Sequence, residues 1–228
     1  MSAIVTEMIT FQAGETEVPA YLARPDDEHA HPGIVVIQEW WGLVPHIKEV
    51  AERIAREGYV ALAPDLYHGE KAEEPDEARK LAMKLDRERA VAEIEGAMDH
   101  LRGLEAVGSG QIGLVGWCMG GGLALSTAAE AEDVGAVVVF YGRPLEDEDA
   151  IRIEAAVLGH YGELDQGIPV GSVRAFEEAM TSHGIFCDIR IYPGAGHAFF
   201  NETRAAYDPD AAMAAWKRTL EWFDEHLN

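Results

Sequence analysis

One cysteine of the sequence stands in a setting that suits a nucleophile. Cys118 is at the centre of Gly116-Trp117-Cys118-Met119-Gly120, which ends a β-branched run and opens a run of small residues typical of a helix. A strand-to-helix turn this tight needs glycine on both sides of the central residue, and it lifts that side chain out of the sheet. We therefore expect Cys118 to be a catalytic nucleophile. The alternative is a tight glycine turn around a buried, inert cysteine.

Two later loops supply an acid and a histidine in the order that a nucleophile of this kind requires. Asp165 follows an apolar run that ends at Gly159, and His197 lies in a glycine-rich turn before the last helical segment. Taken singly, either residue is more often a turn former or a surface side chain. In this order we expect His197 to move the thiol proton and Asp165 to orient the imidazole. His160 and Glu163, in the same loop as Asp165, are the fallback candidates.

A third loop predicts the groups that stabilise an oxyanion. The segment Gln38-Glu39-Trp40-Trp41-Gly42 follows an apolar run. In a strand-to-helix elbow of this kind, the backbone N–H after the nucleophile and one from an earlier loop together bind the oxyanion. We expect these donors to be the N–H groups of Met119 and Trp40. A carboxylate in so apolar a loop must have a partner if it is ionised, which makes Glu39 a candidate for the site. The alternative is that Glu39 is an ordinary surface or helix-capping glutamate.

Several aromatic residues flank these positions. Trp41, Tyr141, Phe199 and Phe200 could line an apolar substrate pocket, and they could equally well belong to the core. We predict no metal site, because the nine histidines show no spacing typical of metal ligands.

The elements that must position these residues alternate between short apolar runs and longer segments with helical periodicity. This pattern predicts an α/β fold with a mostly parallel eight-stranded sheet and helices on both faces. The first two strands have no helix between them, which predicts an antiparallel hairpin at one edge. The expected strands are 4–11, 17–23, 33–38, 59–64, 111–117, 136–141, 155–159 and 186–192, and the expected helices are 46–57, 77–84, 87–106, 120–129, 172–183 and 210–226. The acidic cluster 146–149 is predicted to be an exposed loop.

Length and composition narrow the class of protein. The 228 residues suit one α/β domain, 1–228, and nothing marks a second domain. The net charge of −23 opposes nucleic acid. No signal peptide and no run long enough to span a bilayer are evident, which predicts a cytoplasmic protein without membrane contact. The two cysteines, Cys118 and Cys187, fit a reducing compartment, with a disulfide between them as the alternative. The sequence does not indicate an oligomeric state.

The motifs together resemble the dienelactone hydrolase family of α/β-hydrolases, which includes carboxymethylenebutenolidase. The matching features are the Gly-x-Cys-x-Gly-Gly elbow, the Gln-Glu-x-x-Gly segment, the His-x-Gly-x-x-Asp loop and the Gly-x-x-His-x-Phe turn. The resemblance covers nearly the whole chain. It implies an α/β-hydrolase fold and a triad of Cys118, His197 and Asp165. It further implies that Glu39 contacts the thiol at rest and helps to remove its proton when substrate binds.

The same resemblance implies hydrolysis of a small lactone or carboxylic ester through an acyl-enzyme, without metal or organic cofactor. Family members that act on dienelactone hold the substrate carboxylate with arginines, one of them shortly after the catalytic histidine. Here that stretch reads Phe199-Phe200-Asn201-Glu202, and Arg204 is the nearest cation. Three arginines of the mid-chain helices could replace the other one: Arg79, Arg87 and Arg89. A neutral ester and a different lactone therefore stay open as substrates.

Two other functions remain as alternatives. The first is a non-catalytic member of the fold that binds a small acyl ligand. The second is a redox protein in which Cys187 resolves an oxidised Cys118, although the position of Cys187 inside an expected strand favours a core residue.

Overall fold

The computed structural model describes residues 3–108 and 110–227. The chain divides into two compact units, Met1–Leu114 and Val115–Asn228. Each is described by itself below, and the single domain expected from the sequence stays a prediction.

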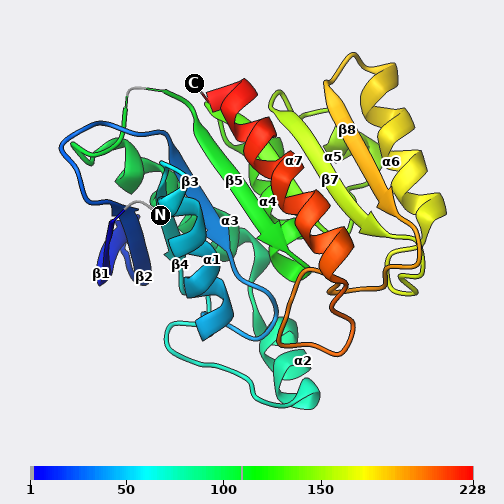
Figure 1. The fold of residues 1–228 in the computed structure, drawn as a ribbon, viewed down its shortest axis with the longest axis horizontal. Helices are drawn as coiled ribbons and strands as arrows, with labels where there is room; N and C mark the ends of the chain where they lie inside the picture. The colour runs from blue at the N-terminus through cyan, green and yellow to red at the C-terminus, as the bar shows by residue number, and fades with distance from the viewer. Residues whose placement is uncertain (1–2, 109, 228) are drawn as a thin grey trace. The chain divides into compact units, whose positions relative to one another are not determined.

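In the first unit, a hairpin is joined to two inner strands in the order β1-β2-β4-β3. The strands are β1 (Ile4–Ala13), β2 (Thr16–Pro25), β3 (Gly33–Ile37) and β4 (Val60–Pro64), and the helices are α1 (Pro45–Arg56), α2 (Pro75–Lys84) and α3 (Arg87–Arg102). β1 and β2 are antiparallel, as predicted for the edge hairpin, whereas β3 and β4 are parallel. Figure 1 draws α1 in front of these strands and α3 behind them, and both helices contact β3 and β4.

The second unit carries a parallel arrangement in the order β5-β6-β7-β8. The strands are β5 (Ile112–Trp117, which begins in the first unit), β6 (Val134–Phe140), β7 (Ala156–Gly162) and β8 (Cys187–Tyr192), and the helices are α4 (Met119–Glu130), α5 (Asp147–Ala150), α6 (Val170–Ser182) and α7 (Pro209–Leu227). β6, β7 and β8 pair in parallel. In Figure 1, α7 lies in front of this part of the sheet and α4 lies behind it.

The apolar runs explain why the inner strands form. β3 reads Gly-Ile-Val-Val-Ile and β6 reads Val-Gly-Ala-Val-Val-Val-Phe, and every residue of both strands is buried. A strand with helices on both of its faces has no polar side, so it loses the alternation seen in half-exposed strands. The helices begin and end on local signals: the Asp86 side chain accepts from Arg89 N–H at the start of α3, and Gly58 at φ +95° follows α1.

Three expectations about the elements differ from the structure. β7 continues to Gly162, so that His160 lies inside a strand and not in a loop. The acidic cluster forms the short helix α5, because Glu146 accepts the N–H groups of Asp149 and Ala150 and closes one helical turn. The third helix ends at Arg102, because Gly103 forms its C-cap.

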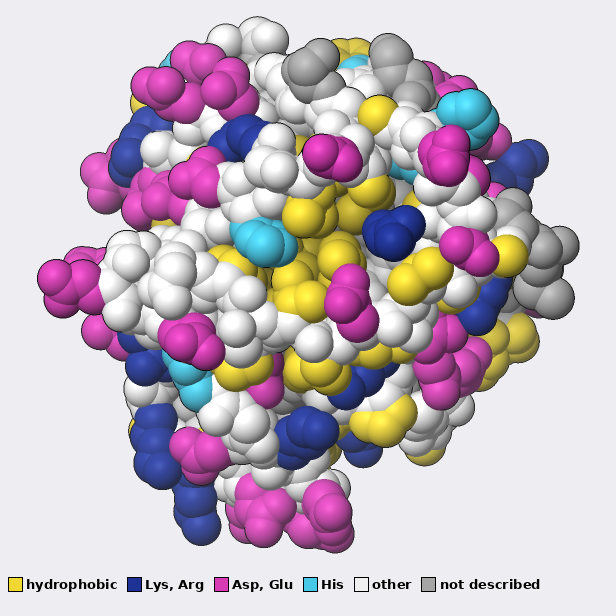
Figure 2. Space-filling model, turned by 90° about the vertical axis from the view of Figure 1, so that its left-hand side faces the viewer, with side chains coloured by type: hydrophobic (Ala, Val, Ile, Leu, Met, Phe, Trp, Pro, Cys, Tyr) yellow, Lys and Arg dark blue, Asp and Glu magenta, His cyan; other side chains and the backbone are white. Residues whose placement is uncertain are grey.

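The surface carries the excess of acidic side chains. Figure 2 shows one face, with Asp and Glu side chains spread around it and hydrophobic side chains gathered near its middle. None of the helices within residues 3–108 and 110–227 is both long and apolar enough to cross a bilayer.

Candidate active site

The turn between β5 and α4 holds Cys118 in an unusual backbone conformation. Its φ of 54° and ψ of −115° lie outside the regions that side-chain-bearing residues usually occupy. The Cys118 N–H donates to Phe140 O at 2.9 Å, which ties the turn to the end of β6. The side chain is half-buried and the sulfur forms no disulfide. Strain of this kind persists only where the surroundings enforce it.

Close backbone contacts around the turn enforce this conformation. A Cβ on Gly116 would lie 2.1 Å from Gly120 O, and a Cβ on Gly142 would lie 2.5 Å from the carbonyl carbon of Gly121. Both distances are too short for any side chain, so the first turn of α4 can approach the ends of β5 and β6 only through glycine. Met119 is the first residue of α4, where backbone N–H groups have no acceptor within the helix itself. The turn therefore places the sulfur at the positive end of a helix dipole.

Asp165 is held in a tight loop after β7. Its Oδ1 accepts the N–H groups of Gly167 at 2.8 Å and Ile168 at 3.0 Å. Its Oδ2 lies 2.7 Å from His197 Nδ1. The carboxylate itself is buried. Burial raises the pKa of Asp165, but the hydrogen bond from His197 and the two backbone N–H groups outweigh this effect and lower it.

The loop of His197 packs directly on the loop of Asp165. A Cβ on Gly162 would lie 2.5 Å from Ala195 O, so the two loops meet backbone to backbone. The Leu164 N–H donates to Ala195 O at 2.8 Å, and the Gly194 N–H donates to the Glu163 carboxylate at 2.9 Å. These contacts fix the imidazole relative to its carboxylate.

The surroundings of His197 favour its protonated form. Burial alone would lower the pKa of His197, but the hydrogen bonds to Asp165 and Cys118 and the negative charge of both groups raise it to about 10. Because Nδ1 faces the carboxylate, Nε2 is the nitrogen that remains for the sulfur. The structure thus brings Cys118, His197 and Asp165 together in the second unit.

The fallback residues have other surroundings. His160 is fully buried in β7, where Tyr192 O–H donates to Nδ1 at 2.9 Å and Nε2 lies 3.1 Å from Thr219 Oγ1. Burial lowers the pKa of His160 to about 3, so it is neutral. Thr219 donates its own hydrogen to Ala215 O, which means that His160 carries its proton on Nε2. Sequence reasoning missed this buried chain, since nothing in the sequence links Thr219 to β7.

The predicted pocket residues of this unit are buried aromatic rings. The Tyr141 ring centroid lies 5.0 Å from that of His197 and 5.4 Å from that of Phe199. Phe200 packs against Phe140 and Trp117. All of them belong to the core, and a role in substrate binding stays a prediction.

Glu39, Trp40 and Trp41 lie in the first unit, directly after β3. Glu39 and Trp41 are buried, with exposed fractions of 2% and 7%. The Trp40 and Trp41 rings meet edge to face at 5.2 Å. Gly42 adopts φ +91°, and its N–H donates to Glu39 O at 3.3 Å, closing a tight turn. The roles predicted for Glu39 and Trp40 stay predictions.

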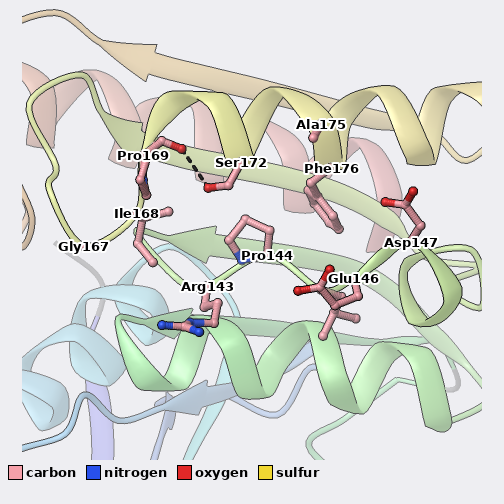
Figure 3. A pocket seen from close by; sticks show the side chains of 11 residues that line it. Arg143, Pro144, Glu146, Asp147, Gly167, Ile168, Pro169, Ser172, Ala175 and Phe176 are labelled. Carbon is pink, nitrogen blue, oxygen red and sulfur yellow. Dashed lines mark hydrogen bonds between the residues drawn. The ribbon is translucent and has the colours of Figure 1, made fainter.

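A cavity of about 320 Å³ adjoins the Asp165 loop within the second unit. Figure 3 shows it between α6 and α4, with Phe176 and Pro144 pointing toward each other across it. Gly167 and Ile168 form part of its wall, and the same residues donate their N–H groups to Asp165. None of Tyr141, Phe199 and Phe200 lines it. Among residues 3–108 and 110–227, no three His, Cys, Asp or Glu side chains are grouped as metal ligands.

Comparisons with known proteins agree with the resemblance drawn from the motifs. The family model of the dienelactone hydrolase family matches residues 18–227. "Putative carboxymethylenebutenolidase" of Methylorubrum extorquens is 33% identical, over 99% of this chain and 85% of that protein. "Protein usf" of Aquifex pyrophilus is 34% identical, over 97% of this chain and 99% of that protein.

Solved structures extend the agreement to the fold. The crystal structure titled as a putative dienelactone hydrolase from Klebsiella pneumoniae has a TM-score of 0.91 and 29% identity, and the match covers 98% of this chain and 100% of that one. The predicted fold class is therefore confirmed: an α/β-hydrolase fold with an eight-stranded, mostly parallel sheet.

Proposed function

Because the chain belongs to the dienelactone hydrolase family, which supports a hydrolase function, we propose that it hydrolyses a small lactone or carboxylic ester with Cys118 as the nucleophile. One observation carries the proposal: His197 is bonded on one side to the buried Asp165 carboxylate and on the other to the Cys118 sulfur, and both contacts raise its pKa. An imidazolium in this position stabilises a negatively charged sulfur. It is also ready to donate a proton.

Acylation begins when the thiolate attacks the carbonyl carbon of the substrate. The carbonyl oxygen becomes an oxyanion, which the Met119 N–H at the start of α4 would stabilise. When the tetrahedral intermediate collapses, the bond to the ring or ester oxygen breaks and that oxygen takes the proton from His197. The products of this half-reaction are a thioester on Cys118 and a neutral imidazole.

Deacylation needs His197 to act as a base, and the same contacts explain the change of role. Both the hydrogen bond to Cys118 and the charge of the sulfur raise the pKa of His197 in the resting protein. A thioester sulfur carries no charge, so the pKa of His197 falls once Cys118 is acylated. The neutral imidazole then takes a proton from water, the resulting hydroxide attacks the thioester, and the thiolate leaves together with release of the acid. Asp165 holds the imidazole throughout.

The remaining sequence predictions complete the proposed site. We include Glu39 as the residue that helps to remove the proton of Cys118 in those molecules whose sulfur is still a thiol when substrate binds, and the Trp40 N–H as the second oxyanion donor. We also include the rings of Trp41, Tyr141, Phe199 and Phe200 as the apolar wall of the substrate pocket. The proposed partner is the small-molecule substrate alone, with no nucleic acid and no membrane. The proposed compartment is the cytoplasm.

The test is a screen of enol-lactones, aliphatic lactones and aryl esters with the wild-type protein and with Cys118→Ser, Cys118→Ala and Cys187→Ser. We expect turnover of at least one class, an acyl-protein detected by mass spectrometry on Cys118, and loss of turnover in both Cys118 variants. Cys187→Ser is the matched control and should keep full activity, because Cys187 lies in β8 as a free thiol. Wild-type rates in Cys118→Ala would overturn the mechanism. Tight binding without turnover would indicate the ligand-binding alternative.

A further inference from the structure

β8 is an edge strand with an unpaired side. It ends the strand order, and β7 is its one hydrogen-bonded neighbour among the strands of the described chain. Phe186, just before β8, is 62% exposed although its ring stacks on Trp222 at 5.4 Å. A free sheet edge next to a large exposed aromatic ring is a surface on which another strand can pair.

The hydrogen bonds to β7 show which backbone groups face outward. Phe186 O accepts from Val157 N–H, and Tyr192 O accepts from Glu163 N–H, both at 3.0 Å. Backbone groups alternate in direction along a strand, so residues 186, 188, 190 and 192 point theirs toward β7. Cys187, Ile189 and Ile191 therefore present their N–H and C=O groups to the free side.

The side chains of the other four residues share one face of β8, because successive side chains alternate across a sheet. Asp188 and Phe186 both contact α7 there: Asp188 accepts from Arg218 Nε at 3.2 Å, and Phe186 stacks on Trp222. Arg190 is exposed, and its guanidinium forms an ion pair with Asp188 of the same chain, with Nε 2.7 Å from Oδ1. A facing Arg190 of a second copy would therefore join a carboxylate that already binds arginine within its own chain. This face thus reads aromatic, negative, positive, aromatic along the strand.

That order is complementary to itself when the strand is reversed. We propose that β8 pairs with β8 of a second copy of this chain, antiparallel, with the two-fold axis at Ile189. Asp188 of one copy then faces Arg190 of the other, and Phe186 faces Tyr192, and each pair occurs twice. These are non-hydrogen-bonded positions, where facing side chains lie closest, while Ile189 of each copy exchanges backbone hydrogen bonds with its counterpart.

The neighbouring registers are disfavoured. With the axis at Asp188 the two copies of that carboxylate face each other, and with the axis at Arg190 the two guanidinium groups do. Like charges directly opposite each other destabilise a strand pair. The axis at Ile189 is therefore the register that both charges select.

The net charge of −23 per chain acts against any self-association through long-range repulsion. At physiological ionic strength, salt largely screens the repulsion between exposed charges that are more than about 8 Å apart. The dimer should therefore gain population as salt rises from a few millimolar to physiological concentration.

The first experiment measures molar mass by light scattering at physiological salt. We expect the wild-type chain to be a dimer, and Arg190→Asp and Asp188→Arg each to be monomers, because each variant places like charges opposite each other twice. An equimolar mixture of the two variants should dimerise again, since residues 188 and 190 of the two copies then carry opposite charges in both facing pairs. Arg152→Asp, an equal change of charge on an exposed side chain outside β8, should leave the dimer intact.

A monomeric wild type, an unchanged dimer in Arg190→Asp, or a mixture that stays monomeric would each overturn the proposal. Thermal melting of every variant shows that the fold is kept. The mixture keeps the test valid even if Asp188→Arg loses some stability with its bond to Arg218. Hydrolase activity is measured separately, so failure of this proposal and failure of the proposed function can be distinguished.

A second experiment tests the register by cross-linking. With the axis at Ile189, Cys187 of one copy faces residue 191 of the other as a hydrogen-bonded pair, about 5.5 Å apart between Cα atoms. This distance suits a disulfide. Ile191→Cys should therefore give a covalent dimer under mild oxidation, and Ile191→Cys with Cys187→Ser should not. Within one strand the two positions are about 13 Å apart and cannot be bridged.

Discussion

His197 Nδ1 lies 2.7 Å from Asp165 Oδ2, and the same carboxylate accepts two backbone N–H groups through its other oxygen. Asp165→Asn removes the charge and gives His197 a partner that can also donate. We expect kcat/KM to fall by about 10³-fold or more, as when an orienting acid is lost from a comparable triad. The pKa of His197, measured by NMR, should drop from its value of about 10.

The matched control for that variant is Glu163→Gln, in the same loop. Its exposed carboxylate accepts the Gly194 N–H. We expect Glu163→Gln to keep the wild-type rate and the wild-type pKa of His197. If the two substitutions lowered kcat/KM equally, the rate would depend on the conformation of the loop and not on the charge of Asp165.

The raised pKa of His197 makes stability depend on alkaline pH. The folded value of about 10 exceeds the ordinary value of 6.5, so between these pH values the folded chain holds a proton that the unfolded chain releases. The stabilisation that His197 contributes to the fold is fully present below about pH 6.5 and is lost as the pH rises through about 10. The difference in free energy of unfolding between wild type and His197→Gln should therefore shrink over that range in urea titrations. If the difference in free energy of unfolding stayed constant over this pH range, the raised pKa of His197 would be contradicted.

His160 should act in the opposite direction, on the acid side. Its pKa of about 3 lies below the ordinary 6.5, so the unfolded chain binds the proton first as the pH falls. This costs stability progressively between 6.5 and about 3. His160→Gln should lower stability at neutral pH by about 1–3 kcal/mol, through its lost hydrogen bonds, but flatten the acid slope. An unchanged acid slope would show that another group causes it.

The glycines of the elbow and of α6 should respond differently to a methyl group. Gly116→Ala places a Cβ 2.1 Å from Gly120 O, so we expect a loss of about 3 kcal/mol or more together with loss of activity. Gly171→Ala, in the first turn of α6, meets nothing within 4 Å. It should raise stability by about 0.5–1 kcal/mol, because alanine loses less backbone entropy in a helix. Denaturant titration of both variants, with activity alongside, gives the comparison.

The sequence predicted the parts of the fold that depend on local patterns. Cys118 could be placed at a turn because glycine is obligatory beside it, and β3 and β6 could be recognised because a strand buried on both faces is apolar throughout. Asp165 and His197 could be placed in loops after successive strands, and the structure shows the hydrogen bond between them.

What the sequence did not predict depends on distant partners. The sequence predicts a loop at His160, because the expected strand ends at residue 159. In the structure Tyr192 and Thr219 satisfy both ring nitrogens of His160, and β7 continues to Gly162. The acidic cluster 146–149 is predicted to be an exposed loop, yet Glu146 O accepts two backbone N–H groups and closes a single helical turn there. The burial of Phe199 and Phe200 likewise follows from rings contributed by other elements.

The positive φ of Cys118 means that the proposed nucleophile lies at a position where its own side chain lowers the stability of the fold. Any side chain at residue 118 bears the same backbone strain, and glycine alone is free of it. Under the proposed function, Cys118→Gly would therefore relieve this strain and remove the nucleophile. The backbone at residue 118 is thus least strained without the side chain that the proposed reaction requires.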